Sequence, residues 1–391
     1  MSPRIYLDYN ATTPVFPEVV EAMRACWAEP SLNPASQHEF GRRAHKVLED
    51  TRDRIAELLG ASTRDRVIFT SGGTESNNLA IRGLLDGRTG RLSDQSKRAR
   101  LVTSGIEHPS VATLGEYLAR NGCNVDHMPV DGNGVLEVEA ASQLLSAETR
   151  AVVAMLANNE TGVIQPVGKL AAICKSHGVP VHTDAAQIAG KLPLSFQDLD
   201  VATMTIAAHK FGGPVGIGAL VVRSDVQLPP LLHGGVQQAG TRPGTESVPL
   251  AVGMRTALEL WHSNRAQWLA HLEALRDAFE SSLKAADSAI EVLGERADRL
   301  PTTSNIAFVG LDRQALFVAL DQAGIACSTG SACASGSSEP SPTHVAMGLS
   351  PALVSSALRF SFGIQTTQAH VSESLGRILR ICNNLRSRKV G

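Results

Sequence analysis

The chain has 391 residues, of which 43% are hydrophobic and 19% are charged, and its formal net charge at pH 7 is -2. This composition is typical of a globular enzyme and excludes a disordered chain. The charge balance disfavours nucleic acid or an anionic membrane as the main partner, and no apolar run approaches the ~20 residues of a membrane span. Six scattered cysteines and the lack of a signal or transit pattern near Met1 predict a cytoplasmic protein.

Apolar runs of strand length alternate with helical segments. In chain order, we expect strands at 67–70, 100–103, 151–156, 179–182, 201–206 and 219–222, a helix at 75–84 and a surface loop at 86–98. This alternation predicts an α/β fold with a mostly parallel sheet that helices cover on both faces. Such sheets bind ligands at the carboxyl ends of their strands.

A long helical pattern begins near residue 250 and is expected to lead into a smaller α+β domain. In that domain, strands are predicted at 303–309 and 357–361. The predicted division is a large domain of residues 15–260 and a small domain of residues 1–14 and 261–391. The small domain contains a cysteine-bearing loop at about 327–345.

Two residues at strand ends indicate a carbonyl cofactor. Lys210 stands between the apolar run 201–206 and a glycine turn, where desolvation suits a Schiff-base amine. Asp184 follows another apolar run and precedes Lys210 by about 25 residues, which suits the pyridinium nitrogen of pyridoxal phosphate (PLP). Each residue alone is a weak signal, but in this order the two together favour PLP strongly.

Other strand ends carry polar motifs with two interpretations each. Gly73 and Thr74 precede a helix, which predicts a phosphate site or an ordinary capped helix start. His108 is placed to stack on a cofactor ring and move protons, although a lone histidine is more often structural. In the segment 158–162, an asparagine donates a hydrogen bond to cofactor or substrate, or it forms an Asx turn.

Three further features lie outside these strand ends. Arg359 lies in an apolar strand and needs an anionic partner, either a substrate carboxylate or an internal salt bridge. The glycine-rich segment 234–245 is a flexible loop or an anion-binding loop, and Arg242 and Thr245 favour the second. Cys327 and Cys333 lie in a glycine- and serine-rich segment, too far apart for a CxxC pair and without a zinc motif, so Cys333 is predicted to be a nucleophile.

Taken together, the motifs closely resemble the PLP-dependent cysteine desulfurases of the NifS/IscS type, in the class-V aminotransferase family. The matching motifs are Tyr-Leu-Asp-Tyr-Asn-Ala-Thr-Thr-Pro at 6–14, Asn-Pro-Ala-Ser at 33–36, Ser-Gly-Gly-Thr-Glu-Ser-Asn-Asn at 71–78, Asn-Asn-Glu at 158–160, Gly-Ser-Ala-Cys at 330–333 and Arg-Phe-Ser-Phe-Gly at 359–363. The resemblance implies PLP fold type I, an aminotransferase-like homodimer with shared active sites, and conversion of L-cysteine to L-alanine. The long segment after Cys333 resembles the group that hands sulfur to scaffold proteins.

The resemblance also implies a role for each matching residue. Lys210 would form the Schiff base, Asp184 would bind the ring nitrogen, and His108 would stack on the ring as acid and base. The remaining cofactor ligands would be Gln187 and Asn159 at the ring oxygen, and Gly73, Thr74, His209 and the second subunit's Thr245 at the phosphate. Arg359, Asn33 and Asn159 would bind the substrate.

Cys333 would accept the sulfur as a persulfide and pass it to an acceptor, such as an iron–sulfur scaffold or a tRNA-thiolation relay. No intrinsic metal site is expected, although Cys333 could ligate a transferred iron–sulfur cluster. The open alternatives are a selenocysteine lyase, another fold-type-I PLP enzyme, or a scaffold that has lost catalysis.

The sequence departs from the family pattern at three positions. Ala207 stands where a serine hydroxyl usually binds the phosphate, a loss of roughly 1.5–3 kcal/mol unless Thr205 or a water compensates. Val215 stands where a basic residue is common after the proline. Cys327 stands where alanine, valine or serine is more common. We expect it to be structural, and the alternative is a secondary persulfide or disulfide role.

Overall fold

The computed structural model describes residues 4–29, 33–86, 99–330 and 339–390. Its largest sheet has seven strands in the order β2-β8-β7-β6-β5-β3-β4. In chain order these are β2 (Arg66–Thr70), β3 (Arg100–Ser104), β4 (Asn124–Met128), β5 (Thr149–Val153), β6 (Val181–Asp184), β7 (Thr203–Ala207) and β8 (Gly218–Val222).

The direction of the strands confirms the predicted mostly parallel sheet. β3, β4, β5, β6 and β7 pair in parallel. β8 is antiparallel to both of its neighbours, so β2 runs in the same direction as the parallel strands. The carboxyl ends of all strands except β8 therefore lie at one edge of the sheet, where ligands are expected.

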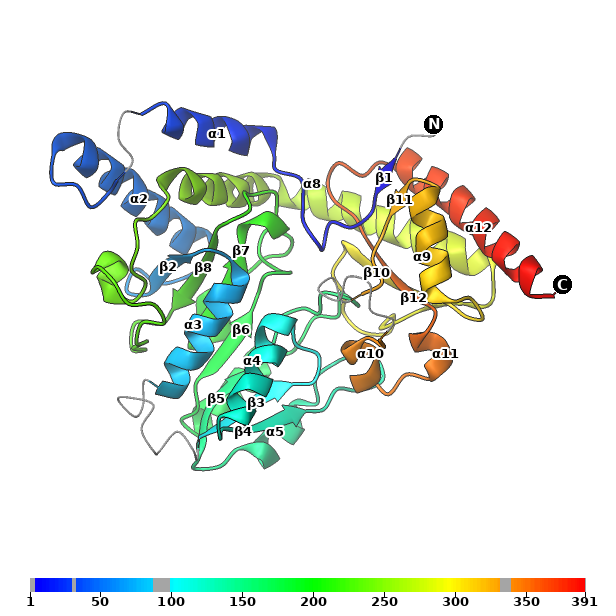
Figure 1. Cartoon of the computed structure of the whole chain (residues 1–391), viewed down its shortest axis with the longest axis horizontal. Helices are drawn as coiled ribbons and strands as arrows, with labels where there is room; N and C mark the ends of the chain where they lie inside the picture. Colours follow the sequence, from blue (N-terminus) through cyan, green and yellow to red (C-terminus); the bar gives the residue numbers. More distant parts are fainter. Residues whose placement is uncertain (1–3, 30–32, 87–98, 331–338, 391) are drawn as a thin grey trace.

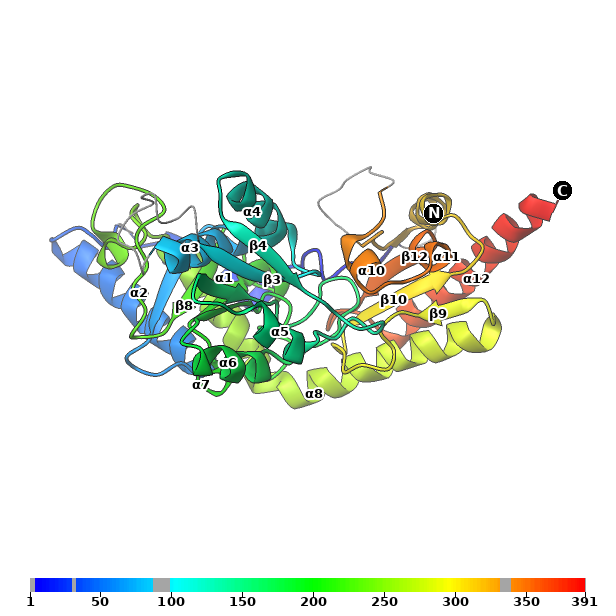
Figure 2. The same cartoon turned by 90° about the horizontal axis from the view of Figure 1, so that it is seen from below.

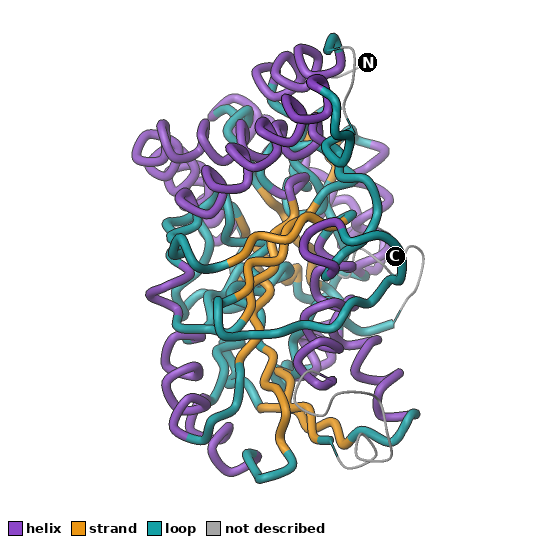
Figure 3. The backbone as a smooth tube through the Cα atoms, turned by 90° about the vertical axis from the view of Figure 1, so that its left-hand side faces the viewer, coloured by secondary structure: helices purple, strands orange, loops and turns teal. Residues whose placement is uncertain are grey.

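Helices cover both faces of this sheet (Figures 1 and 3). One face packs against α3 (Gly73–Asp86) and α4 (Pro109–Arg120), and the other packs against α1 (Pro17–Trp27), α2 (Glu39–Leu58), α5 (Val138–Leu144), α6 (Val167–Ser176) and the first part of α8 (Val248–Ala286). The period-2 alternation of a strand explains this split, because Ile68 enters the α3 core while Val67 and Phe69 enter the opposite one.

A second, smaller core lies toward the C-terminal end of α8 (Figure 2). Its elements are β9 (Ile290–Val292), β10 (Thr303–Phe308) and β12 (Ala357–Ser361) in an antiparallel sheet, the parallel pair β1 (Ile5–Tyr6) and β11 (Ile325–Ala326), α9 (Arg313–Gln322) and α12 (Gln368–Val390). The aromatic ring of Phe360 packs in it against Phe279 in a tilted arrangement and against Phe308 edge-on. The 39-residue helix α8 runs past both cores, as its apolar pattern predicts.

Some boundaries differ from the expected ones. The strand expected at 151–156 ends at Val153, although the amides of Ala154 and Leu156 still donate to the carbonyls of His182 and Asp184 in β6. The expected loop at 86–98 lies, beyond Asp86, outside the described residues. The division into domains at residue 260 stays a prediction. None of the described helices is long and apolar enough to cross a membrane.

Candidate active site

The topology brings the predicted site residues to one edge of the sheet. Gly73 follows β2, His108 follows β3 and Asn159 follows β5. Asp184 ends β6, and Lys210 closes a single 3-10 turn (η2, Ala208–Lys210) directly after β7. Residues far apart in the sequence thus meet for the reason that the strand pattern predicts.

Asp184 is held by a partner that the sequence reasoning missed. Its side chain is 7% exposed, and Oδ2 accepts a hydrogen bond of 2.7 Å from Asn77 Nδ2 on α3. Oδ1 accepts a second hydrogen bond of 2.9 Å from the Ala186 amide. These two donors fix the orientation of the carboxylate at the end of β6.

Asn77 continues this network to two histidines. Its Oδ1 accepts from Nε2 of the buried His182 at 3.0 Å, and burial lowers the pKa of His182 to about 4. Its Nδ2 also donates to Ser110 Oγ at 2.8 Å. Ser110 then donates to Nδ1 of His108, from Oγ at 2.8 Å and from its amide at 3.1 Å.

His108 therefore makes a structural contact, which is separate from its predicted role. The ring accepts at Nδ1 and caps the start of α4. Burial is the largest influence on its pKa and lowers it; the nearby Lys210 acts in the same direction, while Asp184 opposes it. The neutral ring carries its proton at Nε2, because Nδ1 accepts two hydrogen bonds. Stacking and acid–base roles stay predictions.

The N-terminal segment lies across the site and contacts Lys210. Lys210 Nζ donates to the carbonyl oxygens of Asn10 at 2.9 Å and Ala11 at 3.0 Å. His209 Nδ1 lies 3.3 Å from Thr12 Oγ1. Burial and then the neighbouring cations, Lys210 first, lower the pKa of His209 to about 4.

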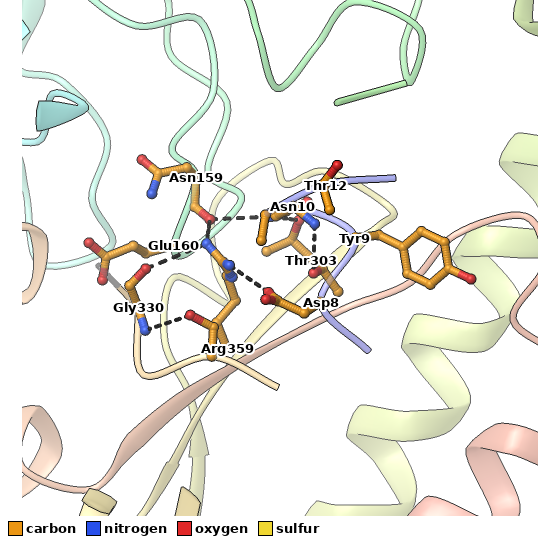
Figure 4. A network of polar contacts seen from close by, with 12 residues as sticks. Asp8, Tyr9, Asn10, Thr12, Asn159, Glu160, Thr303, Gly330 and Arg359 are labelled. Atoms are coloured by element: carbon orange, nitrogen blue, oxygen red, sulfur yellow. Dashed lines mark hydrogen bonds and ion pairs between the residues drawn. The ribbon is translucent and has the colours of Figure 1, made fainter. Parts of the chain in front are cut away.

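Arg359 forms the internal salt bridge that one interpretation predicts, and it keeps a donor for the anion that the other requires. The guanidinium is 1% exposed, and Nη2 donates to Asp8 Oδ1 at 2.6 Å, so an internal salt bridge is present (Figure 4). Nη1 donates to the Asn159 carbonyl at 2.9 Å and approaches the Gly330 carbonyl at 3.5 Å. Nε is buried and has no hydrogen-bond partner among the described residues, which leaves a donor for an anion. Binding of a substrate carboxylate stays a prediction.

Of the two asparagines after β5, Asn158 forms the predicted Asx turn, and Asn159 is left as the candidate for binding cofactor or substrate. Asn158 forms the Asx turn, since its Oδ1 accepts from the amides of Glu160 and Thr161 at 2.9 Å each. The Asn159 side chain lies apart from the Asn10 and Arg359 contacts that its carbonyl makes (Figure 4). Its predicted role toward the cofactor or substrate stays a prediction.

Two predicted residues lie away from this cluster. Asn33 is exposed, and its Oδ1 accepts from the Ala35 amide at 3.0 Å, without a hydrogen bond to Arg359 in the described ranges. Thr245 is exposed as well. Arg242, which favoured an anion-binding loop, already donates from Nε to Glu75 Oε1 at 2.8 Å.

Cys333 lies outside the described residues, but the segments that flank it are fixed. Glu160, another residue whose role the sequence reasoning missed, accepts at Oε2 a hydrogen bond of 2.7 Å from Ser341 Oγ. A Cβ added at Gly330, whose φ is +111°, would lie 2.3 Å from the same Oε2. Cys327 on the N-terminal side is buried, and burial raises the pKa of its thiol, as a structural cysteine requires.

The donor set fits the chemistry of PLP. A Cβ added at Gly73 would lie 3.5 Å from Ala207 Cβ and 3.7 Å from Thr205 Cγ2, so β7 lies directly beneath the start of α3. The Thr205 hydroxyl is buried and has no hydrogen-bond partner among the residues described. A helix N-terminus with an unpaired hydroxyl beside it suits a phosphate, and the Asp184 carboxylate and the Lys210 amine suit a pyridine ring with an aldehyde.

Comparison with known proteins gives consistent results. The model of the family described as aminotransferase class-V matches residues 5–373. The chain is 37% identical to the cysteine desulfurase IscS of Dictyoglomus turgidum over 387 residues (99% of this chain and 96% of that one), and 41% identical to a cysteine desulfurase of Rhodobacter capsulatus over 385 residues (98% of each). A solved structure of a NifS-like protein superposes with a TM-score of 0.89 at 33% identity, covering 98% of this chain and 100% of that one.

Proposed function

Since this chain belongs to the class-V aminotransferase family and is a cysteine desulfurase within it, we propose that it converts L-cysteine to L-alanine and transfers the sulfur to Cys333 as a persulfide. One observation of the structure supports this most directly. The Lys210 amine and the Asp184 carboxylate follow adjacent strands at the carboxyl edge of the sheet. A PLP enzyme needs these two groups at the two ends of one ring.

PLP is a general trait of this family, and when bound it supplies an electron sink for charge that develops at the substrate Cα. The residues that would hold it are Asp184 at the ring nitrogen, Lys210 at the aldehyde, Gln187 and Asn159 at the ring oxygen, His108 over the ring, and Gly73, Thr74 and His209 at the phosphate. Thr205 would add its unpaired hydroxyl on the same side.

The chain's own residues then carry out the proton and sulfur steps. Arg359 would bind the substrate carboxylate while Asp8 and the Asn159 carbonyl fix its guanidinium. The Lys210 amine would take the proton from Cα. The Cys333 thiolate would attack the substrate sulfur, so that an S–S bond forms and the C–S bond breaks with its electron pair on carbon. Protonation of that carbon, together with return of a proton to Cα by Lys210, would yield L-alanine.

The proposed partners follow the same reasoning. An exposed Thr245 is consistent with a residue that completes the phosphate site of a second copy of this chain. The persulfide on Cys333 needs a sulfur acceptor, such as an iron–sulfur scaffold or a tRNA-thiolation relay.

The test is release of products from L-cysteine by protein reconstituted with PLP in the presence of a reductant. We expect a yellow protein that forms alanine and sulfide in equal amounts. A yellow protein that forms no alanine from L-cysteine, with or without an added sulfur acceptor, would refute the proposal. A colourless protein that does not retain PLP would do so as well.

Restoring the missing hydroxyl should strengthen cofactor binding. Ala207→Ser places an oxygen beneath the first residue of α3, and one hydrogen bond to a charged phosphate lowers the Kd for PLP about tenfold or more. Thr205→Val, which removes the unpaired hydroxyl without changing the side-chain shape, should raise the Kd. Titration of apoprotein with PLP, followed by absorbance, measures both. An unchanged Kd in Thr205→Val would show that Thr205 does not compensate for Ala207.

A further inference from the structure

Lys191 is a buried lysine that the proposed reaction does not use. It lies after β6, four residues beyond Gln187, and its side chain is 5% exposed. Among the described residues, the charged groups that act on it are two other cations, Lys210 from η2 and Arg359 from β12. A buried ammonium without a carboxylate partner is costly, so this environment favours the neutral amine.

The hydrogen bonds of Lys191 match a neutral amine. Nζ donates to Gln187 Oε1 at 2.6 Å and to Asn10 Oδ1 at 3.2 Å, which uses both N–H groups of the uncharged form. Burial lowers the pKa of Lys191 well below its usual value, and Lys210 and Arg359 act in the same direction. The hydrogen bonds of Lys191 and the neighbouring charges therefore both favour the neutral amine.

This contact and one to the Asn10 carbonyl together decide which way the Gln187 amide points. Because Oε1 accepts from Lys191, the amide nitrogen faces the opposite way and donates to the Asn10 carbonyl at 3.2 Å. That same oxygen accepts from Lys210 Nζ at 2.9 Å. A flipped amide would set Gln187 Oε1 against the Asn10 carbonyl and leave the amine without its acceptor.

We propose that Lys191 is a positioning residue that fixes the Gln187 amide with its N–H group toward the ring oxygen of the cofactor. The inference rests on the proposed function, which assigns Gln187 to that oxygen. An amide nitrogen carries two N–H groups, so one is left for the ring oxygen after the bond to Asn10. Without Lys191, only the Asn10 carbonyl opposes the flipped amide, whose Oε1 would repel the ring oxygen.

The test uses the visible absorbance of the PLP-bound protein as a function of pH. An N–H donor at the ring oxygen weakens the hydrogen bond between that oxygen and the neighbouring proton. It therefore lowers the pH at which this proton is lost. Lys191→Met should therefore raise the midpoint pH of the absorbance change by about one unit. Gln187→Leu should raise it similarly, and the double variant should show no further shift, because Lys191 acts through Gln187. Lys175→Met, at an exposed lysine of α6, is the matched control and should leave the midpoint unchanged.

Two results would overturn the inference: an unchanged midpoint in Lys191→Met, or a Lys191→Met shift that persists in the Gln187→Leu background. Thermal unfolding checks that each variant is folded. If Lys191→Met does not fold, Lys191→Gln replaces it, because glutamine keeps an N–H donor and should retain the wild-type midpoint. A rise of the midpoint by about one pH unit in Lys191→Gln would contradict the inference. Absence of a visible band in the wild-type protein would instead refute the proposed function.

Discussion

Lys210→Ala should abolish alanine formation from L-cysteine, with a loss of about 10⁴-fold or more, because the proposed function makes this residue both the cofactor's amine partner and the base at Cα. The fold survives, since Lys210 is half-buried and its described hydrogen bonds run to two carbonyl oxygens of the N-terminal segment. Chromatographic measurement of alanine gives the rate, and circular dichroism confirms the fold. Lys175→Ala on the surface of α6 is the matched control.

A chemical experiment distinguishes Lys210 from Lys191, the buried lysine nearby. Borohydride reduction of the wild-type protein with PLP, followed by peptide mass mapping, should place the cofactor on Lys210. Lys191 competes for this assignment, because it is also desolvated and Lys210 influences its pKa. Normal turnover in Lys210→Ala, or a label on Lys191, would refute the assignment of the Schiff-base lysine.

The second large effect is expected at Cys333. Cys333→Ser should still show the spectral change that L-cysteine produces with bound PLP, but it should form no persulfide and release no sulfide. A serine hydroxyl does not attack the substrate sulfur at neutral pH, whereas a thiolate does. Alkylation of the persulfide followed by mass spectrometry locates the sulfur.

Cys327→Ala is the informative comparison for Cys333, since Cys327 is six residues away but buried, with a raised thiol pKa. It should retain turnover, with a loss of stability from the cavity alone. Persulfide at Cys327 together with preserved turnover in Cys333→Ser would show that the predicted nucleophile is wrong.

The sequence predicted the sheet well wherever a strand is a buried apolar run. β12 has the predicted bounds, and β2 and β8 each differ by one residue, since their side chains are mostly buried on both faces. β4 was not expected, because Asn124–Met128 is largely exposed and has no apolar pattern. β1 and β11 are two residues each, and only their mutual pairing defines them.

The strand ends predicted that the candidate residues meet at one edge of the sheet, but not how they are held. Asp8 and Arg359 form one ion pair across 351 positions of sequence, and Lys191 meets Asn10 across 181. No local sequence pattern indicates that either of these contacts forms. The strongest available signal was Lys191 itself, since it stands among apolar and small residues at 188–194 and therefore needs a specific partner.

The anchoring of Gly330 and Ser341 against Glu160 sets a geometric limit on sulfur delivery. Cys333 is three residues from Gly330 in the sequence. Under the proposed function, an acceptor would therefore have to bring its own sulfur nucleophile close to Glu160, so that shape complementarity around this carboxylate would decide which proteins receive the sulfur.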